Sequence, residues 1–211
     1  MRDVSGVEEE NLGPKETDLT EVQKFYQLLN QGKTSTTQRL STANNTPIVQ
    51  DAEFWFEQGY QKYMNGDFIG LITSLDRALE IKPDKHQAWS KRGNALGNLG
   101  RFEQAIASYD RALEIKPDYH EAWNNRGIAL KNLGRLEEAI ASWDQAIKIN
   151  SNDADAYYNK ACCYGLQNNV ELAIENLQRA INFDVEYQDM AKTDKDFEQI
   201  RGDQRFQSLL S

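Results

Sequence analysis

Two histidines and two cysteines are the residues that could bind a metal ion or take part in acid–base or redox chemistry. His86 and His120 lie 34 residues apart at the same position of a repeating pattern. Equivalent positions in successive repeats indicate a repeated surface feature rather than a pair of metal ligands. Cys162 and Cys163 are adjacent, and neighbouring cysteines rarely pair with each other. We therefore expect two reduced thiols on a packed helix, with a redox role as the minor alternative.

No motif in the sequence supplies the rest of an active site. There is no glycine-rich loop that would cradle a phosphate, no Cys/His cluster with zinc-ligand spacing, and no nucleophile with an evident base. The many Asp and Glu side chains fall on exposed helical positions, where solvation explains them. We therefore predict a protein that is not an enzyme and that uses no metal and no cofactor.

The composition indicates an acidic, helix-rich chain that can fold. Of the 211 residues, 39% are hydrophobic and 27% are charged. The net charge of −9 argues against binding to nucleic acid or to an anionic membrane, because such surfaces attract clustered cations. The sequence opens with no charged-then-apolar leader and contains no apolar run that could cross a bilayer. We expect a cytoplasmic protein.

The elements that position these residues repeat every 34 residues. The segments starting at Trp89 and Trp123 almost superimpose, a looser copy starts at Trp55, and a fourth is in register at Tyr157. No insertion breaks the period from residue 52 to residue 185. The same step relates three further sets, namely Gly66, Gly100 and Gly134; Ala78, Ala112, Ala146 and Ala180; and Pro83 and Pro117.

Each copy predicts a pair of helices. The first helix ends at the glycine equivalent to Gly100, because glycine tolerates the left-handed conformation of a tight helix stop, and Asn168 takes this role in the fourth copy. The second helix stops at Pro83 or Pro117, since proline disfavours helical geometry in the preceding residue. One such hairpin cannot bury its apolar surface alone, so the copies must stack.

Small residues are expected at the contact between the two helices of each pair. The small residues of the first helices are Gly59, Gly93, Gly127 and Ala161. They should lie against the second helices, which offer Ala105, Ala139 and Ala173. Large residues and their equivalents should fill the surrounding core: Trp89, Leu96, Ile106, Tyr109 and Leu113.

This pattern resembles the tetratricopeptide-repeat signature at eight positions of the second copy: Trp89, Gly93, Leu96, Gly100, Ala105, Tyr109, Ala112 and Pro117. The resemblance implies an all-α fold, an α-solenoid with a right-handed superhelix of helix-turn-helix repeats and a concave groove lined mainly by the first helices. The repeats span residues 51–185 as four copies: 52–85, 86–119, 120–153 and 154–187. The first copy departs at Leu71, and the fourth lacks both the glycine and the proline.

The ends of the chain differ from the repeats. Residues 188–211 resemble the tail of bacterial repeat proteins, cyanobacterial ones especially, and we expect a C-terminal helical cap over the open end of copy four, with a docking element as the alternative. Its apolar residues have helical spacing: Phe197, Ile200, Phe206, Leu209 and Leu210. Residues 1–16 are expected to be a disordered tail. Residues 32–50 are expected to form a polar linker.

Between them, residues 17–31 predict an amphipathic helix with the apolar stripe Val22, Phe25, Tyr26 and Leu29. This helix could pack on copy one, lie in the groove of its own chain, or recruit a partner.

A charged set recurs at the seams between copies. Arg92, Arg126 and Lys160 replace the usual leucine, and Asp76, Asp110 and Asp144 lie on the preceding second helices. We predict ion pairs of Asp76 with Arg92 and of Asp110 with Arg126. The alternative is a basic ladder that binds acidic ligands.

The groove is expected to have an asparagine-rich floor and an aromatic patch at its N-terminal end. Asparagine amides offer a donor and an acceptor, so a row of them can pair with the backbone of an extended peptide; a generic scaffold is the plainer interpretation. The predicted peptide-binding residues are Phe56, Tyr60, Tyr63, Met64, Lys91, Asn94, Asn98, Asn124, Asn125, Ile128, Lys131, Asn132, Tyr158 and Asn159.

The leading functional prediction is a scaffold or adaptor that binds an unidentified protein or peptide in this groove. The alternative is a homo-oligomeric module, in which residues 17–31 dock in cis or in trans. Some family members bind acidic chaperone tails through a clamp of cations and asparagines. Here Asn94 and Asn125 fit that placement, but Ser90, Asp155 and Asn159 stand where cations are needed, so the clamp is incomplete.

Overall fold

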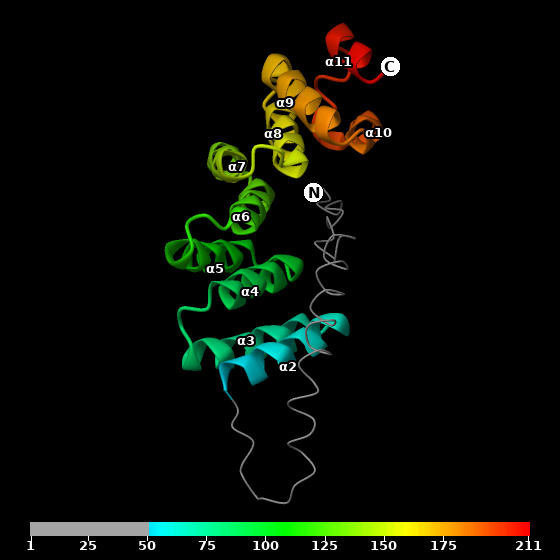
Figure 1. Cartoon of the computed structure of the whole chain (residues 1–211). Helices are drawn as coiled ribbons and strands as arrows, with labels where there is room; N and C mark the ends of the chain where they lie inside the picture. Colours follow the sequence, from blue (N-terminus) through cyan, green and yellow to red (C-terminus); the bar gives the residue numbers. More distant parts are fainter. Residues whose placement is uncertain (1–50) are drawn as a thin grey trace, which may run out of the picture. The chain divides into compact units, whose positions relative to one another are not determined.

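The computed structural model describes residues 51–211; the expected tail 1–16, helix 17–31 and linker 32–50 lie outside the described residues. The described chain is all-helical and contains no strand. Its helices stack as antiparallel pairs (Figure 1). They are α2 (Ala52–Met64), α3 (Phe68–Ile81), α4 (His86–Asn98), α5 (Phe102–Ile115), α6 (His120–Asn132), α7 (Leu136–Ile149), α8 (Ala154–Leu166), α9 (Val170–Phe183), α10 (Glu186–Thr193), the 3₁₀ turn η2 (Lys195–Phe197) and α11 (Gln204–Leu209).

The turns inside the pairs confirm the predicted helix stops. The left-handed residues have φ angles of 69° at Gly66, 68° at Gly100, 71° at Gly134 and 56° at Asn168. In the first turn the Asp67 N–H donates to the Lys62 carbonyl at 2.9 Å, and in the fourth the Asn169 N–H donates to the Tyr164 carbonyl at 2.8 Å. These bonds satisfy carbonyls that the end of a helix would otherwise leave unpaired.

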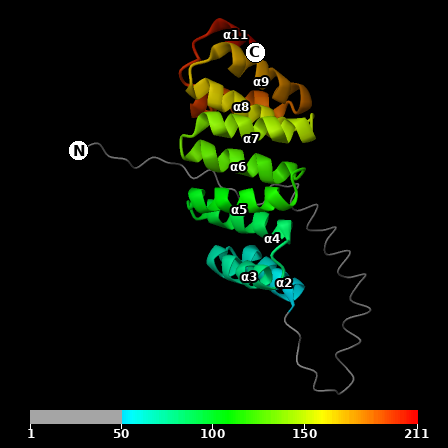
Figure 2. The ribbon, with the colours of Figure 1, turned by 90° about the vertical axis from the view of Figure 1, so that its left-hand side faces the viewer.

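The first helices lie along one side of the stack. Each first helix packs against the second helix of its own pair, and α4 also contacts α6, as α6 contacts α8. The 90° turn of Figure 2 shows α4 to α8 layered one above the other. We call the side formed by α2, α4, α6 and α8 the first-helix face.

The core corrects the expected contact between small residues. At Gly93 and Gly127 the space above the glycine is filled by an aromatic ring of the second helix rather than by alanine alone, whereas Gly59 faces Leu71 and Ser74. A Cβ on Gly93 would lie 2.5 Å from the Tyr109 ring, and one on Gly127 would lie 2.5 Å from the Trp143 ring. Both rings are fully buried. In the fourth pair the equivalent residues are Ala161 and Leu177, so a methyl group accompanies the smaller side chain.

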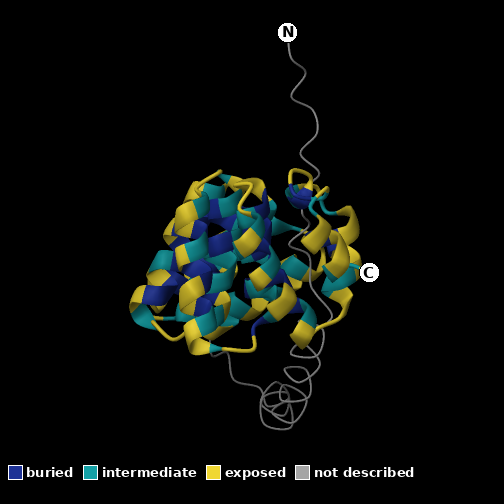
Figure 3. Cartoon of the chain, turned by 90° about the horizontal axis from the view of Figure 1, so that it is seen from above, coloured by how far each residue is buried: buried dark blue, intermediate teal, exposed yellow. Residues whose placement is uncertain are grey.

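The tryptophans of the first helices pack against the edge of the central core cluster. Trp89 and Trp123 are only half-buried. Their indole N–H groups donate to the carbonyls of Pro83 and Pro117, at 2.8 and 2.9 Å. Each ring therefore stabilises the loop that precedes its own helix. Trp143, on a second helix, is the fully buried tryptophan. Figure 3 shows the buried residues inside the stack and the exposed ones around it.

Ion pairs bridge successive repeats, as predicted. Arg92 donates to Asp76 at 2.6 Å and Arg126 donates to Asp110 at 2.7 Å. Each arginine also reaches forward to the hydroxyl of a buried serine, Ser108 or Ser142 respectively. A third pair joins Lys160 to Asp144 at 2.6 Å. Each of these cations pairs with an aspartate of the preceding repeat, so the alternative of a basic ladder that is free to bind acidic ligands is wrong.

The C-terminal segment is more than a cover for the open end of the last repeat. Phe197, Ile200 and Phe206 are fully buried and belong to one cluster with Leu177 of α9. The turn η2 packs on α8, and the Phe197 ring lies over Gly165 of that helix. The segment therefore covers part of the first-helix face as well.

Candidate peptide-binding face

The aromatic patch on α2 is partly covered by neighbouring side chains. Tyr60 and Tyr63 are half-buried, with ring centroids 6.4 Å apart. The Lys85 ammonium lies 4.5 Å from the centre of the Phe56 ring and pairs with Glu53 at 2.6 Å. Of the four residues predicted for the patch, Met64 is the most open, with 53% of its surface exposed.

Two asparagine amides meet between α4 and α6. The Asn94 Oδ1 accepts the Tyr109 hydroxyl at 2.8 Å and the Asn125 Nδ2 at 3.2 Å. Because both bonds use the oxygen, the Asn94 NH₂ group is left with no partner among the described residues. In this arrangement the NH₂ end of the Asn94 amide is the end that can donate to a ligand.

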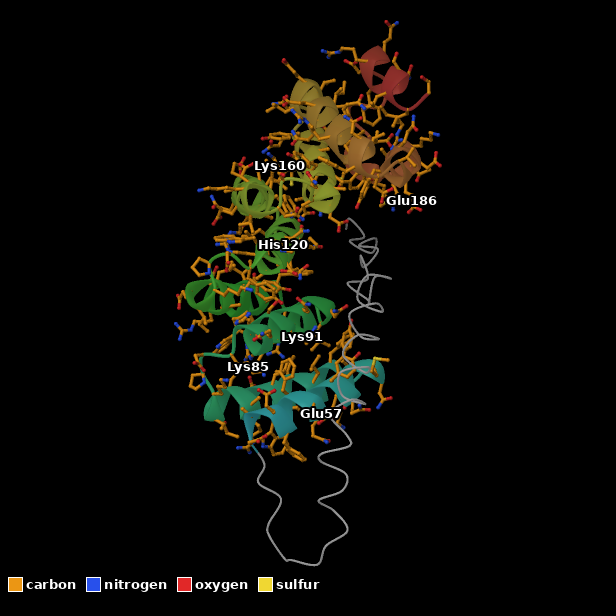
Figure 4. The ribbon with its side chains drawn as sticks, viewed as in Figure 1. Glu57, Lys85, Lys91, His120, Lys160 and Glu186 are labelled. Carbon is orange, nitrogen blue, oxygen red and sulfur yellow. The ribbon has the colours of Figure 1, made fainter. Side chains whose placement is uncertain are left out.

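Lys91 adds a positive charge to the same helix. It is exposed and makes no hydrogen bond or ion pair with any described residue. Figure 4 labels Lys91 on α4 and Glu57 on the neighbouring α2. Lys91, Asn94 and Asn125 together offer donors to an acidic or carbonyl group.

Other predicted residues have structural partners instead. Asn98 and Asn132 bond through Nδ2 to carbonyls four residues earlier in their own helices, Asn94 and Ile128. The Asn124 Oδ1 accepts the Trp143 indole N–H at 2.8 Å, so this residue anchors the core. Ile128 and Asn159 are half-buried, and Ile128 packs against the central core cluster.

The α8 part of the predicted set is covered by the chain itself. Tyr158 is only 5% exposed, and its hydroxyl donates to Asp194 at 2.7 Å. Lys131 pairs with Asp196 at 2.9 Å. The prediction of Tyr158 as an open groove residue is wrong, because residues of the C-terminal segment occupy that position. The signal that was missed is the pair of aspartates in this segment.

Cys162, Asp194 and Asp196 form the one group of potential metal ligands among the described residues, with ligand atoms within 4.8 Å of one another. Their hydrogen bonds give them a different role. Burial raises the pKa of the Cys162 thiol well above its usual value, which keeps the proton on sulfur. This thiol lies 3.7 Å from Asp194, and the Lys131 ammonium neutralises Asp196. The donor set therefore fits a hydrogen-bonded contact better than a cation site.

The histidines are separated in the structure. His86 stacks edge-on against Tyr119, with ring centroids 5.2 Å apart, whereas His120 faces Glu121 at 3.1 Å. Burial lowers the pKa of His86. None of the described helices has the length and apolar character needed to span a membrane.

Comparison with known proteins connects this geometry to a family. One tetratricopeptide-repeat model matches residues 72–120 and 90–154, and a second matches residues 142–175. A search of curated proteins gives no match.

Solved structures share the fold. A crystal structure of MamA protein aligns with a TM-score of 0.68 at 21% identity, covering 77% of this chain and 88% of that one. YrrB, described as a TPR protein with an unusual peptide-binding site, aligns at 0.63 and 15%, covering 77% and 84%. The first TPR of Spaghetti (RPAP3), bound to an HSP90 peptide, aligns at 0.53 and 21%, covering 57% and 95%.

The stacked hairpins, with a left-handed residue at each internal turn, define an α-solenoid of helical repeats. Within that class, the 34-residue period and the matching family models make the chain a tetratricopeptide-repeat protein.

Proposed function

We propose that this chain is a protein-interaction scaffold that binds a peptide or protein segment on its first-helix face. The observation that carries the proposal is the set of unused donors formed by the Lys91 ammonium and the Asn94 NH₂ group, beside Asn125. An exposed ammonium beside a half-buried amide that is held by two hydrogen bonds favours a ligand that brings carbonyl or carboxylate oxygens. The proposal assigns the face no catalytic role.

The affinity of such a site comes from two parts of the face. The α2 patch, with Met64 most open, offers one apolar anchor, and the donors on α4 and α6 orient the backbone. Solved TPR structures that are described with a bound peptide or a peptide-binding site support this use of the fold.

Selection from a random peptide library, followed by calorimetric titration of the selected peptide, tests the proposal. The variants Lys91→Ala and Asn125→Ala should each weaken binding by about tenfold, the loss of roughly one charge-assisted hydrogen bond. Lys148→Ala is the matched control, because Lys148 is an exposed lysine on the second helix α7. Equal affinities for Lys91→Ala, Asn125→Ala and the wild type would remove these donors from the binding site.

A second proposal is self-association through residues 17–31, which would dock on the first-helix face in cis or in trans. The aromatic patch of α2 supports it, because α2 directly follows the N-terminal part of the chain. Light scattering on the full chain and on a chain starting near residue 47 distinguishes the two proposals. One copy per particle in both chains argues against docking in trans.

A further inference from the structure

The C-terminal segment contacts the first-helix face through two carboxylates. The Asp196 Oδ2 lies 2.9 Å from the Lys131 ammonium on α6. The Asp194 Oδ2 accepts the Tyr158 hydroxyl of α8 at 2.7 Å and lies 3.7 Å from the Cys162 sulfur. A single acidic turn is thus held by a cation of the third repeat and by a hydroxyl of the fourth.

An aromatic ring completes the contact. Phe197 is fully buried, with its ring over Gly165 and 5.9 Å from the Tyr158 ring, which meets it edge-on. A Cβ on Gly165 would lie 2.8 Å from the Phe197 ring and 2.7 Å from the Asp196 carbonyl oxygen. Only glycine leaves room for the turn at this close approach.

The acidic turn is preorganised by its own hydrogen bond. The Asp194 Oδ1 accepts the Asp196 backbone N–H at 2.9 Å, which brings both carboxylates to the same side. The helix α10, which leads into the turn, has Ala191 as its one buried residue, and Val185 at its start is 67% exposed. The segment is therefore held by the acidic turn, by the apolar residues that follow it, and by Tyr187 of α10, whose ring lies 4.7 Å from the Tyr158 ring and whose hydroxyl donates to Asp155.

We propose that Lys131, Tyr158, Cys162 and Gly165 form a second peptide site, which recognises an Asp-X-Asp-aromatic turn. In this structure the chain's own residues 194–197 occupy the site as an intramolecular ligand, and a partner protein bearing the same turn displaces them. The inference rests on the proposed function, because both use the first-helix face. It concerns the α6–α8 part of that face and not the donors around Lys91.

The test uses the full chain and a fluorescent peptide with the sequence of residues 191–201, followed by fluorescence anisotropy. Phe197→Ala removes the anchor of the intramolecular ligand and leaves every residue of the site intact. The peptide should bind this variant at least about tenfold more tightly than the wild type, since apparent affinity scales with the fraction of chains whose site is open. Lys131→Met added to Phe197→Ala should abolish the gain, as should asparagine in place of both aspartates of the peptide.

Thiol labelling reports directly whether the site opens. In a Cys163→Ala background, Cys162 is the remaining cysteine, and it is 1% exposed in the closed chain. Maleimide should label it faster in Phe197→Ala than in the otherwise identical chain. If Phe197→Ala fails to fold, the double variant Asp194→Asn with Asp196→Asn weakens the contact and keeps the apolar anchor in place.

Two results would overturn the inference. One is a Cys162 thiol that becomes reactive while the peptide binds no better than a scrambled version. The other is a dimer of Phe197→Ala or of the double variant in light scattering, which would indicate exchange of the segment between copies instead. Lys91→Ala should leave binding of this peptide unchanged, so failure here and failure of the proposed function can be told apart.

Discussion

Replacing Gly127 by alanine is expected to destabilise the protein, although alanine is the better helix former. A Cβ built on Gly127 lies 2.5 Å from Cε2 and 2.6 Å from Nε1 of Trp143, whereas carbon atoms in contact prefer about 3.5–4.0 Å. The ring must therefore move by about 1 Å. It is fully buried and held by hydrogen bonds from its N–H to Asn124, so it has little room to do so.

The magnitude follows from two opposing effects. Overpacking of a close-packed core costs about 1–3 kcal/mol, and the change from glycine to alanine inside a helix returns about 1 kcal/mol. The difference is a net loss of about 0–2 kcal/mol in the free energy of unfolding, and we expect the upper half of that range because the buried ring has little room to move. Gly59→Ala is the matched control, because its Cβ would meet the flexible end of Leu71 at 3.1 Å. It should change stability by less than about 1 kcal/mol.

Urea unfolding followed by far-ultraviolet circular dichroism measures the effect, with the slope m checked for constancy. The fourth repeat supplies a rescue, because it combines Ala161 with Leu177 at the equivalent positions. In a Trp143→Leu background, Gly127→Ala should therefore cost less by about 0.5–3 kcal/mol, the usual range of coupling between touching residues. A Gly127→Ala chain as stable as the wild type would refute the reasoning, as would an unchanged cost in the Trp143→Leu background.

Three further outcomes are expected. Arg126→Ala should lower the free energy of unfolding by about 0.2–1 kcal/mol through loss of its pair with Asp110, whereas Lys148→Ala should have no effect by the same urea titration. Burial raises the pKa of Cys163 to about 12, so labelling by a thiol reagent at neutral pH should be slow until urea is added; rapid labelling of folded protein would contradict this. The pKa of Asp203, which caps α11, is lowered from 3.8 to about 2 by a neighbouring guanidinium. The ionised Asp203 carboxylate therefore contributes its full stabilisation above pH 3.8, and this contribution is lost as the pH falls toward about 2. The protection factors of the α11 amides, which are exchange rates corrected for the intrinsic pH dependence, should fall over that window in the wild type and not in Asp203→Asn.

The fold could be predicted from the sequence because its signals are local and repeat. The left-handed stop at Asn168 follows from the position of that residue in the period, even though the glycine is missing. The pairs Asp76–Arg92 and Asp110–Arg126 follow for the same reason, since one seam geometry serves every copy.

The core partners were harder to predict. Periodicity gives the side of a helix that is buried, but it does not tell which side chain fills a given space. The prediction therefore named Trp123 among the core residues without showing that the fully buried tryptophan of this pair is Trp143.

The α8 part of the candidate site could not be predicted for a different reason. The contact between Lys131 and Asp196 joins residues 65 positions apart and has no equivalent in the other repeats. The 34-residue period therefore could not predict it. The helical spacing of Phe197 and Phe206 indicated a packed tail, but not that the turn before Phe197 would lie on a first helix.

The same long-range contact couples the last two repeats to the tail in folding. A solenoid held only by neighbouring contacts can fray from either end. Here the last helices are tied back to α6 across an intervening hairpin, so repeats three and four must melt together with the tail.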